Sequence, residues 1–200
     1  MLATSASGRD LSVGWVFEPK LDGWRALITC DGIVSVRTRT GRDITTSLPE
    51  LAAPPPSVSA HCAVLDGELV AGAGKPEDFY GIAGRVASRR HSIPLTFVAF
   101  DVLFLDGDSL CHRPYHERRQ LLASLDVCGA SWATVPSFDG GASEVLEACA
   151  DLGLEGLVAK RADSRYRPGQ RSRDWLKLKT PAWREHHAPR RHERAVARSV

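Results

Sequence analysis

The chain has 200 residues, of which 43% are apolar and 25% charged, a composition typical of a globular protein with one large or two small domains. No run of about 18 apolar residues occurs, which excludes a membrane-spanning helix, and the first residues lack the pattern of a signal peptide, so we expect a cytoplasmic protein. The formal net charge is only +2, yet residues 160–200 carry 13 Lys and Arg against 4 Asp and Glu. This uneven charge favours a polyanionic partner.

The first part of the chain is predicted to form short strands. Asp31-Gly32 lies between two apolar segments and predicts a two-residue hairpin, because a type I′ turn requires positive φ at both positions. The expected elements are strands over Trp15–Lys20, Trp24–Cys30 and 62–71, with a short helix over Ser47–Ala53.

The second part mixes helices with strands. The continuous apolar run Leu95–Leu105 predicts a central strand that is buried on both faces. Ser143 is suited to cap a helix that Gly153 ends. The expected elements are helices over Phe79–Ala87, Pro114–Leu125 and 143–152, and strands over 95–105, 156–162 and 174–179.

Many short strands with scattered helices predict an α+β fold with mainly antiparallel sheets. Residues 1–180 are expected to form one domain. Residues 181–200 are rich in His and Arg and show no strand alternation, so they are predicted to be a disordered basic tail.

The segment EPKLDGWR, residues 18–25, is the first candidate for chemistry. Lys20 ends a predicted strand, and the Asp-Gly turn after it would make a rigid mount for a nucleophilic amine. Free lysine has a pKa near 10.4, so only about one amine in a thousand is neutral at pH 7, and a working lysine needs desolvation or neighbouring cations. The K-x-D-G pattern alone is a weak signal, because a surface hairpin with a solvated lysine has the same sequence.

Five further segments follow in a fixed order, and the six together resemble the signatures of the covalent nucleotidyltransferases, which include DNA ligases, RNA ligases and mRNA-capping enzymes. The amino-acid sequences of these segments are most similar to those in the ligase domain of bacterial end-joining ATP-dependent DNA ligases. The segments are EPKLDGWR (18–25), VRTRTGRD (36–43), LDGEL (65–69), FVAFDVLFLDG (97–107), EGLVAK (155–160) and WLKLK (175–179). The resemblance implies an adenylation domain with two mainly antiparallel sheets, flanking helices and ATP in the groove between the sheets.

The resemblance also implies a role for individual residues. Lys20 would attack the α-phosphate of ATP, form a lysyl-AMP phosphoramidate and release pyrophosphate. Glu155, together with Glu68, would hold Mg²⁺, a hard cation that prefers carboxylate and water. The other implied contacts are Glu18 with the adenine amino group, Arg25 and Glu68 with the ribose hydroxyls, Phe100 stacked on the base, Arg39 with the nucleotide or the nick phosphate, and Lys177 and Lys179 with the α-phosphate.

The implied partner is nicked double-stranded DNA, in DNA repair or recombination. Ligases of this type carry an OB-fold domain of about a hundred residues after the last signature, whereas about twenty residues follow Lys179. A separate OB-fold or end-joining protein could therefore act with this chain. One alternative is a nucleotide- or DNA-binding protein without ligation activity, and another, within the enzyme class, is an RNA ligase or a capping guanylyltransferase. Glu18 and the LDGEL segment argue against mRNA capping.

Overall fold

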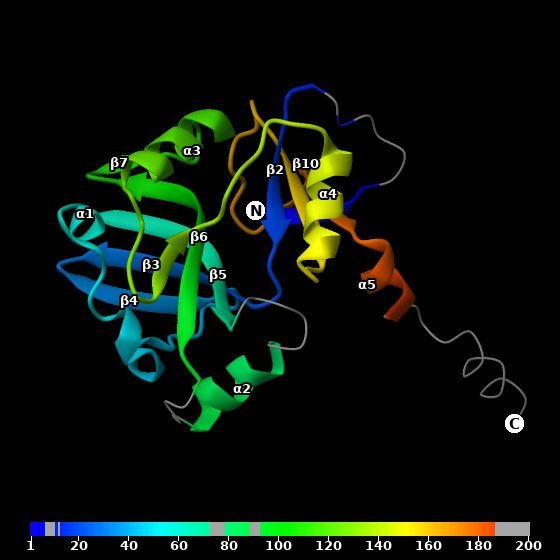
Figure 1. The fold of residues 1–200 in the computed structure, drawn as a ribbon. Helices are drawn as coiled ribbons and strands as arrows, with labels where there is room; N and C mark the ends of the chain where they lie inside the picture. The colour runs from blue at the N-terminus through cyan, green and yellow to red at the C-terminus, as the bar shows by residue number, and fades with distance from the viewer. Residues whose placement is uncertain (7–10, 12, 73–78, 89–92, 187–200) are drawn as a thin grey trace, which may run out of the picture.

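The fold is taken from a computed structural model, which describes residues 1–6, 11, 13–72, 79–88 and 93–186. Two β-sheets lie next to each other, and helices cover their outer faces (Figure 1). This arrangement confirms the α+β architecture that the sequence predicts. Within the described residues, no helix is both long and apolar enough to cross a membrane.

The smaller sheet has four strands, and helix α4 packs on one of its faces (Figure 1). Apolar side chains of the strands, including Phe17, Leu157 and Leu176, form a core with Val145 and Cys149 of the helix. Its pairs are antiparallel except β1 with β10, which is parallel. In sheet order the strands are β1 (Leu2–Ser5), β10 (Arg171–Lys179), β9 (Gly156–Arg161) and β2 (Trp15–Lys20), and α4 spans Ala142–Asp151.

The larger sheet has six strands and contains the main hydrophobic core. The apolar run of the sequence forms its strand β6, which is buried along most of its length, as predicted. The strand order is β4 (Ile33–Thr38), β3 (Trp24–Asp31), β5 (Ala63–Ala71), β6 (Leu95–Leu105) and β7 (Asp108–Ser109), with β8 (Trp132–Thr134) parallel to β6. The helices next to it are η1 (Thr45–Ser47), η2 (Pro49–Leu51), α1 (Pro56–Ser59), α2 (Phe79–Ser88) and α3 (Tyr115–Ser124).

The register between β5 and β6 is interrupted at a place that matters for the site. Asp66 pairs with Asp101 and Gly67 pairs with Ala99, so Phe100 is an extra residue without a partner on β5. Such bulges bend a strand and change the direction of a side chain. The bulge turns Phe100 toward the junction of the two sheets, where it packs with Trp175 of the smaller sheet.

Three local predictions are wrong in detail. The single short helix expected over Ser47–Ala53 is instead the two 3₁₀ turns η1 and η2. The hairpin at residues 31–32 forms, but Gly32 alone has a positive φ, because Asp31 still pairs with Ile33 as the last residue of β3. Helix α4 begins at Ala142 after Gly141, one residue before the expected cap Ser143, and no side chain caps it.

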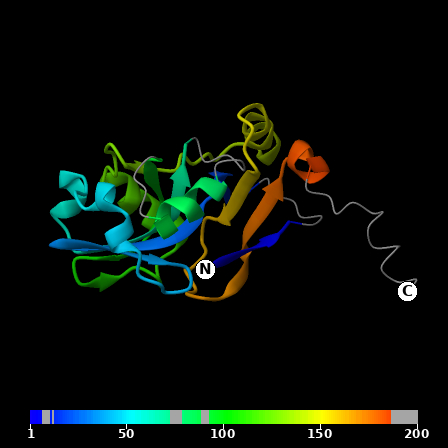
Figure 2. The same cartoon turned by 90° about the horizontal axis from the view of Figure 1, so that it is seen from below.

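Several elements were not predicted, namely β1, α1, β7, β8 and α5. Strand β1 is four residues long and exists through its pairing with β10. A short helix, α5, spans Pro181–His186 at the start of the expected tail, where Pro181 suits a first helical turn and Thr180 Oγ accepts a hydrogen bond from the backbone N–H of Trp183. Residues 187–200 lie outside the described residues. Figure 2 shows the sheets from below, with α5 beyond the smaller sheet.

Candidate active site

The smaller sheet places the predicted lysines on one face. Side chains alternate along a strand, so residues two apart on one strand point to the same face of the sheet, as do residues that pair directly on neighbouring strands. The opposite face packs on α4. Three rows cross the strands β2, β9 and β10 on the free face: Val16–Lys160–Trp175, Glu18–Val158–Lys177 and Lys20–Gly156–Lys179.

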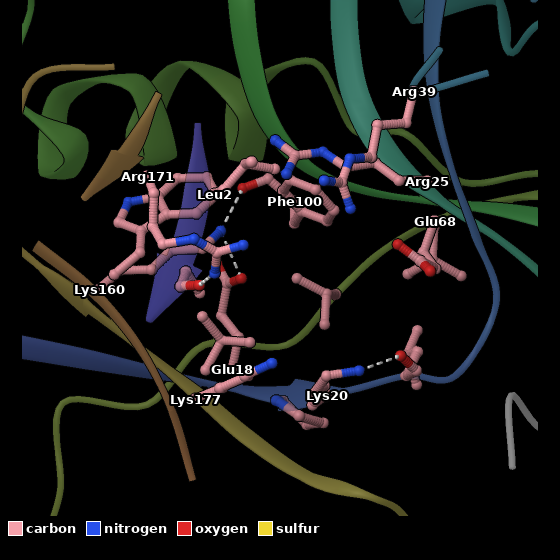
Figure 3. A pocket seen from close by; sticks show the side chains of 17 residues that line it. Leu2, Glu18, Lys20, Arg25, Arg39, Glu68, Phe100, Lys160, Arg171 and Lys177 are labelled. Atoms are coloured by element: carbon pink, nitrogen blue, oxygen red, sulfur yellow. Dashed lines mark hydrogen bonds and ion pairs between the residues drawn. The ribbon is translucent and has the colours of Figure 1, made fainter. Parts of the chain in front are cut away.

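The larger sheet supplies the facing wall. Arg25 on β3, Glu68 on β5 and Val98 on β6 form one row across it, and Phe100 follows at the bulge. Together the two sheets enclose a pocket of about 310 Å³ (Figure 3). The sequence-predicted residues that line it are Glu18, Lys20, Arg25, Arg39, Glu68, Phe100 and Lys177. Figure 3 shows Arg25, Arg39 and Glu68 on one side of the pocket and Lys20 and Lys177 on the other.

The two other predicted residues, Glu155 and Lys179, are connected to this group through ion pairs. Glu155 Oε2 forms an ion pair with Lys20 Nζ, and Glu155 Oε1 lies 3.1 Å from Lys179 Nζ. Burial alone would raise the pKa of Glu155, but the two lysines outweigh it and hold the pKa below its ordinary value. The ammonium of Lys179 also lies 3.0 Å from the ring centre of Trp183. Burial and the charges of Lys179 and Lys20 lower the pKa of Lys177.

Two glycines of the signature segments allow the backbones to approach closely. A Cβ on Gly23, in the LDG turn, would collide with the carbonyl of Leu69 on β5. A Cβ on Gly156 would collide with the carbonyl of Leu178 and the Cα of Lys179. The turn after Lys20 and the strand after Glu155 therefore both depend on glycine at these positions.

Glu68 is the second carboxylate near Lys20. Burial raises the pKa of Glu68 to about 7, although the charges of Lys20 and Arg25 oppose the rise. No group of three or more His, Cys, Asp or Glu side chains is arranged to hold a metal ion within the part of the chain that the structure describes. Glu68 and Glu155 are two carboxylates on which the charge of Lys20 acts.

Arg25 is held by a polar network that the sequence did not indicate. Its Nε and Nη2 donate to the two oxygens of Asp66 at 2.9 and 2.5 Å, and Nη2 also donates to Tyr166 Oη at 3.1 Å. The guanidinium carbon lies 5.3 Å from the centre of the Phe100 ring. Arg25 therefore lines the pocket with most of its hydrogen-bonding capacity already used on one side.

Glu18 likewise has partners that sequence reasoning missed. Its carboxylate forms an ion pair with Lys160 at 2.6 Å and accepts a hydrogen bond from the Tyr115 hydroxyl. Lys160 could have been found, because it ends the EGLVAK segment and shares a strand face with Val158. Tyr115 could not, because it lies on α3, outside all of the signature segments.

Comparisons with known proteins agree with this geometry. A family model described as the ATP-dependent DNA ligase domain matches residues 1–179. A multifunctional non-homologous end joining protein LigD from Mycolicibacterium smegmatis is 38% identical over 181 residues, which are 90% of this chain and 23% of that protein. A DNA ligase from Methanoculleus marisnigri is 40% identical over 172 residues, 81% of this chain and 31% of that protein.

Solved structures give the same result. The ligase domain of LigD from M. tuberculosis superimposes with a TM-score of 0.75 at 35% identity, covering 89% of this chain and 58% of that one. A mycobacterial DNA ligase D complexed with ATP and MES matches with the same TM-score and identity. The chain thus spans about a quarter of the length of the LigD relatives. With the signature segments assembled around one pocket and a family model matched over nearly its whole length, this chain belongs to the ATP-dependent DNA ligase domain family.

Proposed function

We propose that this chain transfers AMP from ATP to its own Lys20, as the first step in sealing nicks in DNA. The observation that carries the proposal is the place of Lys20 in the pocket between the sheets. Its amine lies in a row with Lys179 and beside the row of Glu18 and Lys177, opposite Glu68. Cations on both walls, together with the apolar side chains of Val98, Phe100 and Val158, suit a nucleotide.

The reaction forms one bond and breaks one. The lone pair of Lys20 Nζ attacks the α-phosphorus of ATP, the bond from that phosphorus to the bridging oxygen of the β-phosphate breaks, and pyrophosphate leaves. The amine gives up its proton to solvent as the phosphoramidate forms. Lys177 and Lys179 would offset the charge on the α-phosphate, as positioned cations do for developing negative charge. Glu155, now shared by Lys20 and Lys179, would have to release Lys20 before attack.

The remaining contacts are proposals on the same basis. Phe100 and Val158 line the pocket from the two sheets, and the base would lie between them. Glu18 would accept from the adenine amino group, and Arg25 and Glu68 would contact the ribose. Mg²⁺ commonly uses one or two carboxylates with water and substrate phosphates, so Glu155 with Glu68 would hold it. The ion would neutralise phosphate charge.

The DNA substrate and further partners come from the relatives. LigD proteins are described as multifunctional and as acting in non-homologous end joining. We propose nicked double-stranded DNA as the substrate, with Arg39 on the rim of the pocket as a phosphate contact. The AMP would pass from Lys20 to the 5′-phosphate of the nick, and the 3′-hydroxyl would then displace it. An OB-fold or end-joining protein would complete the DNA-binding surface.

The test of the first step is intact-protein mass spectrometry. After incubation with ATP and Mg²⁺, wild type should gain the mass of one AMP, and Lys20→Ala should gain none. Lys20→Arg keeps the positive charge beside Glu155 and serves as the folded control that also lacks the adduct. A wild-type protein that takes up no AMP at any ATP concentration would contradict the proposal.

Sealing is tested separately with a nicked duplex labelled at its 5′-phosphate. We expect the adenylated chain to yield sealed strand or DNA-adenylate, and more of either when an OB-fold domain from a relative is added. DNA binding with a steep salt dependence but no transfer of AMP would instead support a binding protein.

A further inference from the structure

The carboxylate of Glu18 is held from two sides by groups that belong to different elements. Lys160 Nζ, from β9, lies 2.6 Å from Oε2, and the hydroxyl of Tyr115, from α3, donates to Oε1. Glu18 is 2% exposed, Lys160 1% and Tyr115 0%. Yet Glu18 and Lys160 both line the pocket between the sheets. A fully enclosed acid–base pair therefore forms part of the pocket wall.

Lys160 itself has little freedom to move. Its ammonium donates to the carbonyl of Phe100 at 3.1 Å and lies 4.4 Å from the ring centre of Trp175, 4.5 Å from that of Phe100 and 4.9 Å from that of Tyr115. Three aromatic rings at these distances stabilise a desolvated cation. The cation is thus fixed beside Glu18 by contacts with both sheets and with α3.

Stability alone is a weak reason for such an arrangement. The desolvation of two charges can exceed their attraction, so replacing a buried ion pair by apolar residues is often neutral or stabilising. The pair also lies in a pocket wall, next to the ring of Phe100. These two facts favour a role in binding.

The hydrogen-bonding chemistry indicates what the role is. Burial raises the pKa of Glu18, whereas Lys160 and the Tyr115 hydroxyl favour the ionised carboxylate, which can only accept further hydrogen bonds. Two of its four acceptor positions are used by Lys160 and Tyr115. The free positions would attract an exocyclic amino group and repel a carbonyl oxygen.

We propose that Tyr115 and Lys160 are positioning residues that hold Glu18 as a fixed, ionised acceptor, so that the pocket selects a 6-aminopurine over a 6-oxopurine. This inference rests on the proposed nucleotide site and adds to it the residues that decide the base. Neither residue needs to contact the base. Their effect is transmitted through the orientation and charge of the Glu18 carboxylate.

The experiment compares ATP with ITP, which carries a 6-oxo group and an N1 proton in place of the amino group. Equilibrium binding and kcat/KM for adduct formation are measured for both nucleotides with wild type, Tyr115→Phe, Lys160→Met and Lys160→Arg. A hydrogen bond to a charged group contributes about 1.5–3 kcal/mol, so wild type should prefer ATP roughly 10- to 100-fold. Tyr115→Phe and Lys160→Met should lower that ratio several-fold, and Lys160→Arg should retain most of it.

Arg161→Met is the matched control. Arg161 follows Lys160 on β9, is exposed on the opposite side of the strand and pairs with Asp163, so its loss should leave the ATP-to-ITP ratio unchanged. Equal losses for both nucleotides in Tyr115→Phe and Lys160→Met would show a merely structural role and overturn the inference. A wild type that binds ITP as well as ATP would overturn it too.

The two proposals fail in different ways. If wild type binds ATP in preference to ITP but forms no adduct, the proposed reaction is wrong, and the binding ratios of the variants still decide the inference. If wild type forms the adduct and the variants keep the full preference for ATP, the inference alone is wrong. Tyr115→Phe removes a single hydroxyl, so it gives a folded variant should Lys160→Met unfold.

Discussion

At the scale of single residues, the two carboxylates near Lys20 are shifted in opposite directions. Glu155 faces two lysines, which outweigh its burial and lower its pKa. Glu68 is governed by burial, which raises its pKa to about 7. When the surroundings shift the pKa values of two carboxyl groups in opposite directions, the two groups commonly have different chemical roles. Glu155 is therefore ionised at neutral pH, whereas Glu68 exchanges its proton near the pH at which the protein would act.

The pKa of Glu68 predicts how stability depends on pH without ligands. Its folded pKa lies above the ordinary value of 4.5, so the folded state binds more protons between pH 4.5 and about 7, and wild type should lose stability as pH rises through that range. Glu68→Gln removes this loss. The unfolding free energy of the variant minus that of wild type should therefore increase by up to about 3 kcal/mol between pH 5 and pH 8. Urea unfolding at the two pH values measures this difference.

Glu147→Gln provides the control for this series, because Glu147 is exposed on α4. It should keep the pH dependence of wild type. If Glu68→Gln and wild type changed in parallel between pH 5 and pH 8, the carboxyl of Glu68 would not be desolvated as described.

At the scale of elements, the pairing of β9 with β10 in the smaller sheet depends on Gly156, which has no side chain to keep the two strands apart. Gly156→Ala places a methyl group against the carbonyl of Leu178 and the Cα of Lys179. Backbone atoms on both sides cannot rotate away, so the strands must separate. We expect a loss of about 1–3 kcal/mol in unfolding free energy and slower adduct formation, because Lys179 and Glu155 move with the strands.

The comparison variant is Gly140→Ala, in the loop before α4, where a Cβ meets open space. Chemical denaturation of both variants and wild type checks the first part, and the rate of AMP uptake checks the second. Equal stability of the two variants would contradict the close approach of β9 to β10.

The elements differ in how far the sequence determines them. The apolar run of β6 and the turn at Gly32 carry strong local signals, and both were predicted. Strand β1 has four residues and no periodicity of its own, since its pairing with β10 depends on a segment about 170 residues away. The start of α4 was misplaced because Gly141, not a capping side chain, precedes it.

The candidate site was predictable to the extent that it lies in contiguous segments. Glu18 and Lys20 lie two apart on one strand, as do Lys177 and Lys179, and their common face follows from alternation. Tyr115 was not predictable, because α3 meets β2 only in the folded chain. The bulge that redirects Phe100 depends on the register between β5 and β6, which no local pattern in either strand shows.

At the scale of the whole molecule, the pocket lies where two separately packed sheets meet. One hydrophobic core belongs to the larger sheet and another to the smaller sheet with α4. A third, smaller cluster, which contains Leu103, Tyr166 and Trp175, joins them. Polar links add to it, since Arg25 of the larger sheet donates to Tyr166 and Lys160 of the smaller sheet donates to the carbonyl of Phe100.

Because the pocket wall comes from both sheets, a bound nucleotide should stabilise their junction and with it the whole chain. Binding to the folded state alone adds about 2.7 kcal/mol when free ATP is a hundred times its Kd, which for a chain of this size raises the Tm by roughly 5–10 °C. Thermal unfolding with ATP and Mg²⁺ should show this rise in wild type and in Lys20→Arg. After free nucleotide is removed by gel filtration, wild type should keep part of the rise, since AMP stays bound through Lys20, whereas Lys20→Arg should return to its ligand-free Tm. A rise that disappears in both proteins would mean that the nucleotide binds between the sheets without forming a bond to the lysine.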